Sequence, residues 1–265
     1  MVYCFSNTHA TPRHHGFGTG RISVRCVIKQ EGNLAMDRTV TLATIALGML
    51  GSATASAATR TFPVSAFDRI QSNTPFDVRV HTGTAPSVRA SGPRDALDQL
   101  RVEVADGQLR IGARSRGWFS WNRPGKVLID VTAPMLTAAM LNGPGDLTID
   151  RIRTRSFSAT INGPGDLAVG ALEAEQADLT LNGPGDLTVA GRAGSARLSL
   201  HGPGDIRAAA LTARDAIVTL SGPGDLALTA TGTVQGTASG PGDVTITGGA
   251  RCMIRKSGPG DVHCR

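Results

Sequence analysis

Aromatic residues are scarce in this 265-residue chain, which contains seven Phe, two Trp and one Tyr, together 4% of the sequence. Glycine is abundant by comparison, with 33 residues. A core with so few large side chains has to be thin and built mainly from small aliphatic residues, because close packing leaves no room unfilled. The composition therefore argues against a globular α/β enzyme and favours a narrow repeat architecture.

Catalytic signatures are missing as well. The sequence contains no Gly-x-Ser-x-Gly nucleophile elbow, no His-Glu-x-x-His zinc motif and no phosphate-binding loop. We therefore expect a protein that is not an enzyme and that needs no cofactor, with calcium as the one ion its carboxylates could bind.

A five-residue phrase, Asn/His/Ser-Gly-Pro-Gly-Asp, occurs seven times between Asn142 and Asp261, at intervals of 18 to 20 residues. A fixed period of this size indicates stacked repeats, in which each unit buries its apolar face only against its neighbours. Proline at the second position and glycine at the third position of a turn predict a type II turn. Each phrase is therefore predicted to be a corner between two strands. The first glycines of the seven copies are Gly143, Gly163, Gly183, Gly202, Gly222, Gly240 and Gly258.

Apolar residues alternate with small or polar ones on both sides of every corner, which is the period of a β-strand. The positions predicted to face inward before the corners include Thr137, Ala139 and Leu141. Those predicted after the corners include Leu147 and Ile149. A third apolar column contains Ile152, Leu172 and Leu211 and is interrupted at Arg192, Thr231 and Gly249. We predict an all-β protein: a parallel β-solenoid of about seven rungs of 18–20 residues, with an N-terminal β-rich cap.

The chain divides into four segments. Residues 36–57 have a short charged start, an apolar run and a small-x-small site at Ala55–Ala57, the layout of a secretory signal peptide. Residues 1–35 are expected to be a mis-annotated N-terminal extension, disordered, with translation starting at Met36; a structured leader or a membrane anchor is the alternative. Residues 58–135 are expected to form the β cap and first rungs, and residues 136–265 the repeat solenoid. We expect a periplasmic, secreted or cell-surface protein with no membrane span after cleavage.

The predicted cleavage also changes the net charge and the number of cysteines in the mature chain. Five basic and two acidic residues precede the site, so the net charge of +6 falls and nucleic acid is not an expected partner. Two cysteines remain, Cys252 and Cys264, in an oxidising compartment. They replace inward residues of the last rung, where a disulfide would join the open end of the stack. Two free thiols are the alternative.

The cap is predicted to contain short strands, a hairpin at Asp106–Gly107 and one helical turn over residues 96–100. A Gly/Pro-bounded loop then carries both tryptophans. Exposed Trp118 and Trp121, beside Arg123, could stack on sugar rings or engage acidic envelope polymers. A lid that packs over the first rung is the alternative.

Stacking of the rungs is expected to align one aspartate from each corner into a column of carboxylates, which repel one another unless hydrogen-bonded or neutralised. One interpretation is that each carboxylate accepts backbone N–H groups of its own corner. Another is a calcium-binding edge that stabilises the solenoid. The aspartates are Asp146, Asp166, Asp186, Asp205, Asp225, Asp243 and Asp261.

A polysaccharide-active enzyme is a third hypothesis, because β-helical lyases and hydrolases use Asp and Arg on an exposed face. It requires carboxylates with different environments, and the regular repeat sets none apart. His201 is the one irregularity in a column of Asn and Ser, and we interpret it as a tolerated surface substitution.

Five segments in order carry a resemblance to a known family. They are Phe67-Asp68-Arg69-Ile70, Phe76-Asp77-Val78-Arg79-Val80, Asp106-Gly107-Gln108-Leu109-Arg110-Ile111, Val131-Thr132-Ala133-Pro134-Met135-Leu136, and the Ser/Asn-Gly-x-Gly-Asp repeats. Over residues 60–265 the chain resembles the head-GIN-domain family, bacterial exported proteins often described as autotransporter adhesins. The resemblance implies an exported β-solenoid with a surface or envelope role and carries over no catalytic residue. We expect a non-enzymatic envelope protein, adhesin-like or glycan-binding, whose partner is an envelope polysaccharide or a cell-surface component; its oligomeric state is left open.

Overall fold

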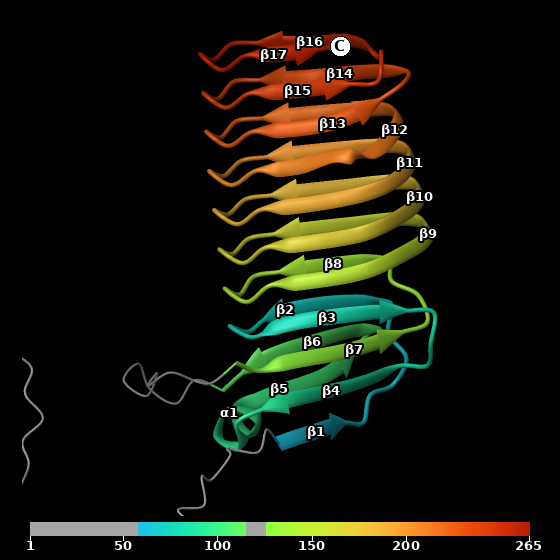
Figure 1. Ribbon diagram of the computed structural model, residues 1–265, viewed down its shortest axis with the longest axis vertical. Coiled ribbons are helices and arrows are strands. Elements are labelled where there is room, and N and C mark those ends of the chain that lie inside the picture. Colours follow the sequence, from blue (N-terminus) through green and yellow to red (C-terminus); the bar gives the residue numbers. More distant parts are fainter. Residues whose placement is uncertain (1–57, 115–125) are drawn as a thin grey trace, which may run out of the picture. The chain divides into compact units, whose positions relative to one another are not determined.

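A computed structural model describes residues 58–114 and 126–265 of the chain. Within these residues it contains seventeen strands and one short helix, so the fold is nearly all β. Strands from successive repeats pair in parallel and in register, which confirms the predicted parallel β-solenoid (Figure 1). The stack has about six turns. This count is close to the seven rungs that the sequence predicted.

Long strands run through the middle of the stack and wrap from one sheet to the other. Each bends at the edge opposite the corners, on the right in Figure 1. In the last turns the bends open and every long strand is replaced by two short ones. These elements are β8 (Ala138–Leu141), β9 (Leu147–Ile161), β10 (Leu167–Leu181), β11 (Leu187–Leu200), β12 (Ile206–Leu220), β13 (Leu226–Ala230), β14 (Thr233–Ala238), β15 (Val244–Thr247), β16 (Arg251–Lys256) and β17 (Val262–Cys264).

Two sheets therefore face each other across the core. The post-corner sheet consists of the strand segments that follow the corners, such as residues 147–149 and 167–169. The pre-corner sheet consists of the segments that precede them, such as residues 157–161 and 177–181. The predicted inward positions are buried in both sheets from Ala139 to Ile246, whereas in the last rung Cys252 is half-buried and Cys264 is exposed. Thr137 is an exception, because it is half-buried and its hydroxyl donates to the carbonyl of Asp68 at 3.0 Å, while the neighbouring Leu136 is buried instead.

The third apolar column is interrupted in β11, as the sequence suggested, but by a glycine and not by Arg192. Leu172 pairs with Gly191, not with Arg192, and Gly191 in turn pairs with Leu211. Gly191 has φ +128°, and a side chain there would collide with the backbone of Leu172. A register shift beside this glycine absorbs the one residue by which this repeat is shorter than its neighbours.

The N-terminal region forms a cap of mixed strands around α1 (Arg94–Gln99). The predicted hairpin at Asp106–Gly107 is confirmed: both residues have positive φ, and the flanking strands pair antiparallel. Antiparallel pairs also end the post-corner sheet at this side of the stack. The cap strands are β1 (Ala58–Phe62), β4 (Ser87–Gly92), β5 (Leu100–Ala105), β6 (Gln108–Ala113) and β7 (Leu128–Ala133).

The order of rungs in space differs from their order in the sequence. β2 (Arg69–Asn73) lies between β6 and β8, and β3 (Asp77–Thr82) lies between β7 and β9, with all four pairings parallel. After β1, the chain thus builds this rung, leaves it to make the rest of the cap, and returns to both of its sides. The remainder of the stack grows sequentially (Figure 1).

Candidate functional site

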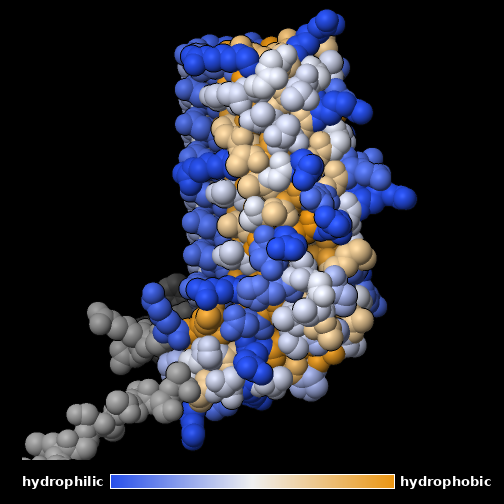
Figure 2. Space-filling view, turned by 45° about the vertical axis from the view of Figure 1, so that its right-hand side comes forward, coloured by the Kyte–Doolittle hydropathy of each residue, from blue (hydrophilic) through white to orange (hydrophobic). Residues whose placement is uncertain are grey.

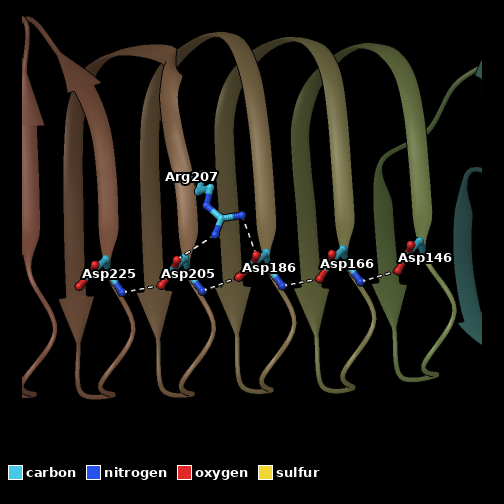
Figure 3. A network of polar contacts seen from close by, with 6 residues as sticks. All are labelled: Asp146, Asp166, Asp186, Asp205, Arg207 and Asp225. Carbon is cyan, nitrogen blue, oxygen red and sulfur yellow. Dashed lines mark hydrogen bonds and ion pairs between the residues drawn. The ribbon is translucent and has the colours of Figure 1, made fainter.

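The corner edge carries the most regular polar array of the described residues. In six successive steps, the backbone N–H of one corner aspartate donates to Oδ1 of the aspartate in the preceding rung, over 2.7–3.0 Å. Figure 3 shows four of these bonds, from Asp225 to Asp146. The carboxylates do accept backbone N–H groups, but the prediction that the donors belong to the same corner is wrong. Each aspartate ties its own rung to the next.

Two cations reduce the repulsion within this column. Arg207, in β12, donates to Oδ2 of Asp186 at 2.6 Å and of Asp205 at 3.0 Å (Figure 3). The charge of Asp186, followed by that of Asp205, raises the pKa of Arg207 above its usual range. At the last corner, Lys256 donates to Oδ1 of Asp261 at 2.8 Å and lowers the pKa of that carboxyl. Lys256 thus takes the place of the backbone N–H that the next rung would supply.

A second column on the same edge consists of side-chain amides. Asn182, Asn162 and Asn142 each donate from Nδ2 to the Oδ1 of the preceding asparagine, over 2.7–2.8 Å, and the series ends on Asn73. His201 follows Asn182 in this column, and its Nδ1 lies 2.6 Å from Oγ of Ser221. The exposed histidine therefore marks the change from amide to hydroxyl contacts, as expected for a surface substitution. The two columns form the hydrophilic edge visible in Figure 2.

The corner glycines are required by close approach and not by backbone conformation. None of the fourteen Gly-Pro-Gly glycines has a left-handed φ, so the predicted type II turn is wrong. A Cβ on Gly185 would instead lie 2.1 Å from the carbonyl oxygen of Gly165 in the preceding rung. Thr74 and Phe76 occupy the equivalent positions of an additional corner between β2 and β3, which the sequence did not reveal because it lacks the glycines.

The calcium hypothesis remains a prediction. One oxygen of every corner aspartate from Asp146 to Asp243 already accepts a backbone N–H. Among residues 58–114 and 126–265, no three acidic, histidine or cysteine side chains converge as a metal-binding group. A cation would therefore have to use the second carboxylate oxygens along the edge. Thermal unfolding with calcium and with excess chelator tests this, and an unchanged midpoint would refute it.

The last rung contains the predicted disulfide. Cys252 in β16 and Cys264 in β17 are joined, with Cα atoms 6.5 Å apart. Cys252 pairs in register with Val234, and Cys264 with Ile246, so both cysteines continue inward columns as the sequence indicated. The bridge connects the two sheets at the end of the described stack.

The tryptophan loop lies outside the described residues, and so do residues 1–57 with the predicted extension and signal peptide. Trp118, Trp121 and Arg123 fall within residues 115–125, so their proposed contacts remain predictions. In the part of the chain that the structure describes, no helix is both long and apolar enough to cross a membrane.

An open depression of about 360 Å³ lies on the outer surface of the pre-corner sheet, and sequence reasoning missed it. Two rows of side chains line it, one residue from each of four successive rungs in each row. The first row is Gln176, Ser195, Asp215 and Thr233; the second is Asp178, Arg197, Ile217 and Gln235. The aligned repeats held a signal for it, because these positions lie seven and five residues before the first corner glycine and vary more than the Thr/Ser column next to them.

The two acidic groups of this depression differ in their contacts. Oδ1 of Asp215 accepts the hydroxyl and the backbone N–H of Thr233, at 2.7 and 3.1 Å, and Oδ2 accepts Nε of Arg214 at 2.8 Å. These bonds, that of Arg214 first, lower the pKa of Asp215 to about 2. Asp178 forms a looser pair with Arg197, at 3.8 Å. Asp215 is thus held in place, whereas Asp178 and Arg197 keep hydrogen-bonding capacity toward solvent.

Comparison with known proteins identifies relatives over most of the repeat region. Residues 66–250 match the family model described as "Putative auto-transporter adhesin, head GIN domain". No functionally curated protein matches the chain.

Several solved structures share the fold. A "putative adhesin" from Bacteroides fragilis superposes with a TM-score of 0.74 at 22% identity, covering 79% of this chain and 97% of its own. A "putative lipid binding protein" from Parabacteroides distasonis gives a TM-score of 0.60 at 20% identity, covering 79% and 97%. A "putative adhesin" from the same organism gives 0.59 at 18% identity, covering 80% and 98%. At these identities the likeness concerns the fold.

Proposed function

The chain belongs to the head GIN domain family, and from that membership we propose that it is a non-enzymatic binding protein of the cell envelope that holds a glycan or another cell-surface component. The family points to an exported or cell-surface protein. Export through a signal peptide at residues 36–57 is part of the proposal. The disulfide between Cys252 and Cys264 supports it, because such bonds persist mainly in oxidising compartments.

One observation carries the binding role: an open depression lined mainly by exposed and half-buried polar side chains lies on the outer face of a sheet whose inner face is buried. The corner aspartates are an unsuitable ligand surface by comparison, because their Oδ1 atoms hold the rungs together. A rigid stack with a polar depression can present a constant surface to an extended partner, which suits binding with little loss of conformational entropy.

The contacts of Asp215 argue against this carboxylate as the general acid of a glycoside hydrolase. Hydrolysis by a carboxylate pair needs one carboxyl with a raised pKa to protonate the leaving group. The pKa of Asp215 is lowered to about 2 by its hydrogen bonds, so this group stays ionised at neutral pH. Release of reducing ends from a bound polysaccharide, abolished in an Asp215→Asn variant, would contradict the non-enzymatic proposal.

Two experiments test the function itself. Residues 58–265 are screened against an array of microbial polysaccharides and against purified cell-wall material, with and without calcium. Saturable binding to at least one of these surfaces is expected, and its absence from all of them would overturn the proposal. N-terminal sequencing of the protein after expression in a bacterium tests export, with Ala58 as the expected first residue.

A further inference from the structure

We propose that the depression on the pre-corner sheet binds a neutral, linear polysaccharide whose chain lies along the stack axis, across β10, β11, β12 and β14. This inference rests on the proposed binding function and assigns that function to a site and a ligand class. The depression has a volume of about 360 Å³, at the small end of the range for ligand pockets, about 300–1,000 Å³. It therefore accommodates a short segment of a polymer.

The direction of the chain follows from the register of the lining residues. Asp178 pairs with Arg197, Arg197 with Ile217, and Ile217 with Gln235, so this row crosses four rungs at right angles to the strands. Neighbouring strands are about 4.8 Å apart. Sugar units of an extended pyranose chain repeat over a similar length, so successive units can meet successive rungs.

Small inward residues account for the depression at three of its four rungs. Its floor contains Ala177, Ala196 and Ala216, which are 2–4% exposed and face the core. The same inward column has Phe157 on one side and Val234 on the other. Because alanine fills less of the space between the sheets than phenylalanine or valine, the backbone can lie closer to the core at these three rungs.

The charges select a neutral ligand. Arg197 faces Asp178, and Arg214 binds Asp215, so the acidic groups at the depression are matched by basic ones. A polyanion would meet two carboxylates without a surplus of cations. Vicinal hydroxyl groups, in contrast, both donate and accept hydrogen bonds and can be shared between the carboxylate of Asp178 and the guanidinium of Arg197.

An apolar side chain completes the set of contacts. Ile217 is 45% exposed in the middle of the second row, between Arg197 and Gln235. One face of a pyranose ring presents only C–H groups, and an exposed aliphatic side chain can pack against it. A pocket that combines an apolar platform with a few polar groups matches the usual composition of small-ligand sites.

The test uses residues 58–265 and measures Kd by titration calorimetry. The probes are neutral hexasaccharides of glucose, mannose, galactose and N-acetylglucosamine, with hexagalacturonate as the charged comparison. The double variant Asp178→Ala/Arg197→Ala removes both members of the pair and so leaves no unpaired charge. Ile217→Glu removes the apolar platform. Arg207→Ala is the matched control, because this arginine is similarly exposed and paired with aspartate but lies on the post-corner sheet.

We expect at least one neutral hexasaccharide to bind, and each depression variant to weaken it by about tenfold or more, with the control unchanged. Melting temperatures of all variants are compared, since a fall shared by the control would reflect folding. If both variants still bind a neutral hexasaccharide with the affinity of the wild type, the binding site lies elsewhere, for example at the loop with Trp118 and Trp121. That result would overturn this inference but not the proposed function. Preference for hexagalacturonate would overturn the ligand class. Binding of no hexasaccharide by a protein that still binds cell-wall material would overturn the inference alone.

Discussion

The backbone N–H of Asp166 donates to Oδ1 of Asp146 across 3.0 Å, although the two residues are 20 positions apart in the sequence. Aspartate in a turn ordinarily bonds to backbone groups of its own turn. Here the side chain acts between turns, so the carboxylate column is also a column of hydrogen bonds along the stack. The phrase has the same five-residue length in every copy, so the aspartate occupies the same place in each rung. The same hydrogen bond therefore forms at each step of the stack.

Replacement of Asp166 by alanine is expected to lower the free energy of unfolding by about 1–2 kcal/mol, because the N–H of Asp186 loses its acceptor. Asp166→Asn keeps an oxygen at the same position and removes one negative charge from the column. We expect it to be close to the wild type in stability. Urea unfolding measures the free energy of unfolding of both variants. Equal losses in the two would mean that charge, and not the hydrogen bond, is the important property of Asp166.

Gly185→Ala is expected to destabilise the solenoid by about 2–3 kcal/mol or to prevent folding, because its Cβ would lie 2.1 Å from the Gly165 carbonyl oxygen. Gly112→Ala in β6 is the control, since a Cβ there meets no atom within 4 Å. The control should be neutral or slightly stabilising, by up to about 1 kcal/mol. Thermal unfolding followed by circular dichroism compares the two. A tolerated Gly185→Ala would refute close approach as the reason for the repeated glycines.

Two buried hydroxyls in β2 and the following corner predict opposite effects. Ser72 is fully buried between Ile111 and Leu141, and its Oγ has no hydrogen-bond partner among the described residues. Ser72→Ala should therefore stabilise the protein by about 1 kcal/mol. Thr74 is also fully buried, but its Oγ1 accepts the N–H of Phe76 at 3.1 Å. Thr74→Val should destabilise by a similar amount. Guanidinium unfolding measures both, and effects of the same sign would contradict the assignment.

Loss of the disulfide should destabilise the end of the stack more than the rest. The bridge between Cys252 and Cys264 closes a segment with a sequence separation of 12. A loop of that size is worth about 3 kcal/mol in the chain-entropy account. In a Cys252→Ser/Cys264→Ser variant, hydrogen exchange is expected to quicken first in β16 and β17. Peptide mapping under non-reducing conditions checks the wild type, where free thiols at both positions would remove the basis of this prediction.

The hydrogen bonds of Asp215 predict an effect of acid on stability. The pKa of this carboxyl falls from its ordinary value of 3.8 to about 2 in the folded protein, owing first to Arg214 and then to Thr233. A lowered pKa in the folded state means that the ionised group stabilises the fold above about pH 4. That contribution is lost as the pH falls toward 2. The difference in melting temperature between the wild type and Asp215→Asn should therefore be constant above pH 4 and shrink below it. A constant difference down to pH 2 would contradict the prediction.

The regular part of the fold could be predicted because its information is local and repeated. The alternation of apolar and polar residues places Leu147 and Ile149 inward, and each later repeat has the same alternation. The alignment of Cys252 with Val234 followed from counting residues back from the corner, since a stack in register converts sequence offset directly into position. The same counting misplaced one residue: the third apolar column is interrupted at Gly191 and not at Arg192, because this repeat is one residue shorter than its neighbours and the register shifts beside Gly191.

The depression was less predictable from the sequence. Tryptophan and repeated aspartates are residue types typical of binding sites, whereas Gln176, Arg197 and Ile217 carry no such signal individually. They form a depression only because register brings them together from separate rungs above a floor of alanines.

The sequence alone determined the repeat length, the inward columns, the corners and the position of the disulfide, since these depend on spacing within and between adjacent repeats. Tertiary structure alone decided that β2 and β3 enter between the cap and the first repeat, so that Asn142 donates to Asn73 across 69 positions. It also decided that aspartates bond to the following rung and that a depression opens on one sheet. These features depend on which surfaces meet after the chain has folded, and the energy of such contacts is not encoded in any single stretch of residues.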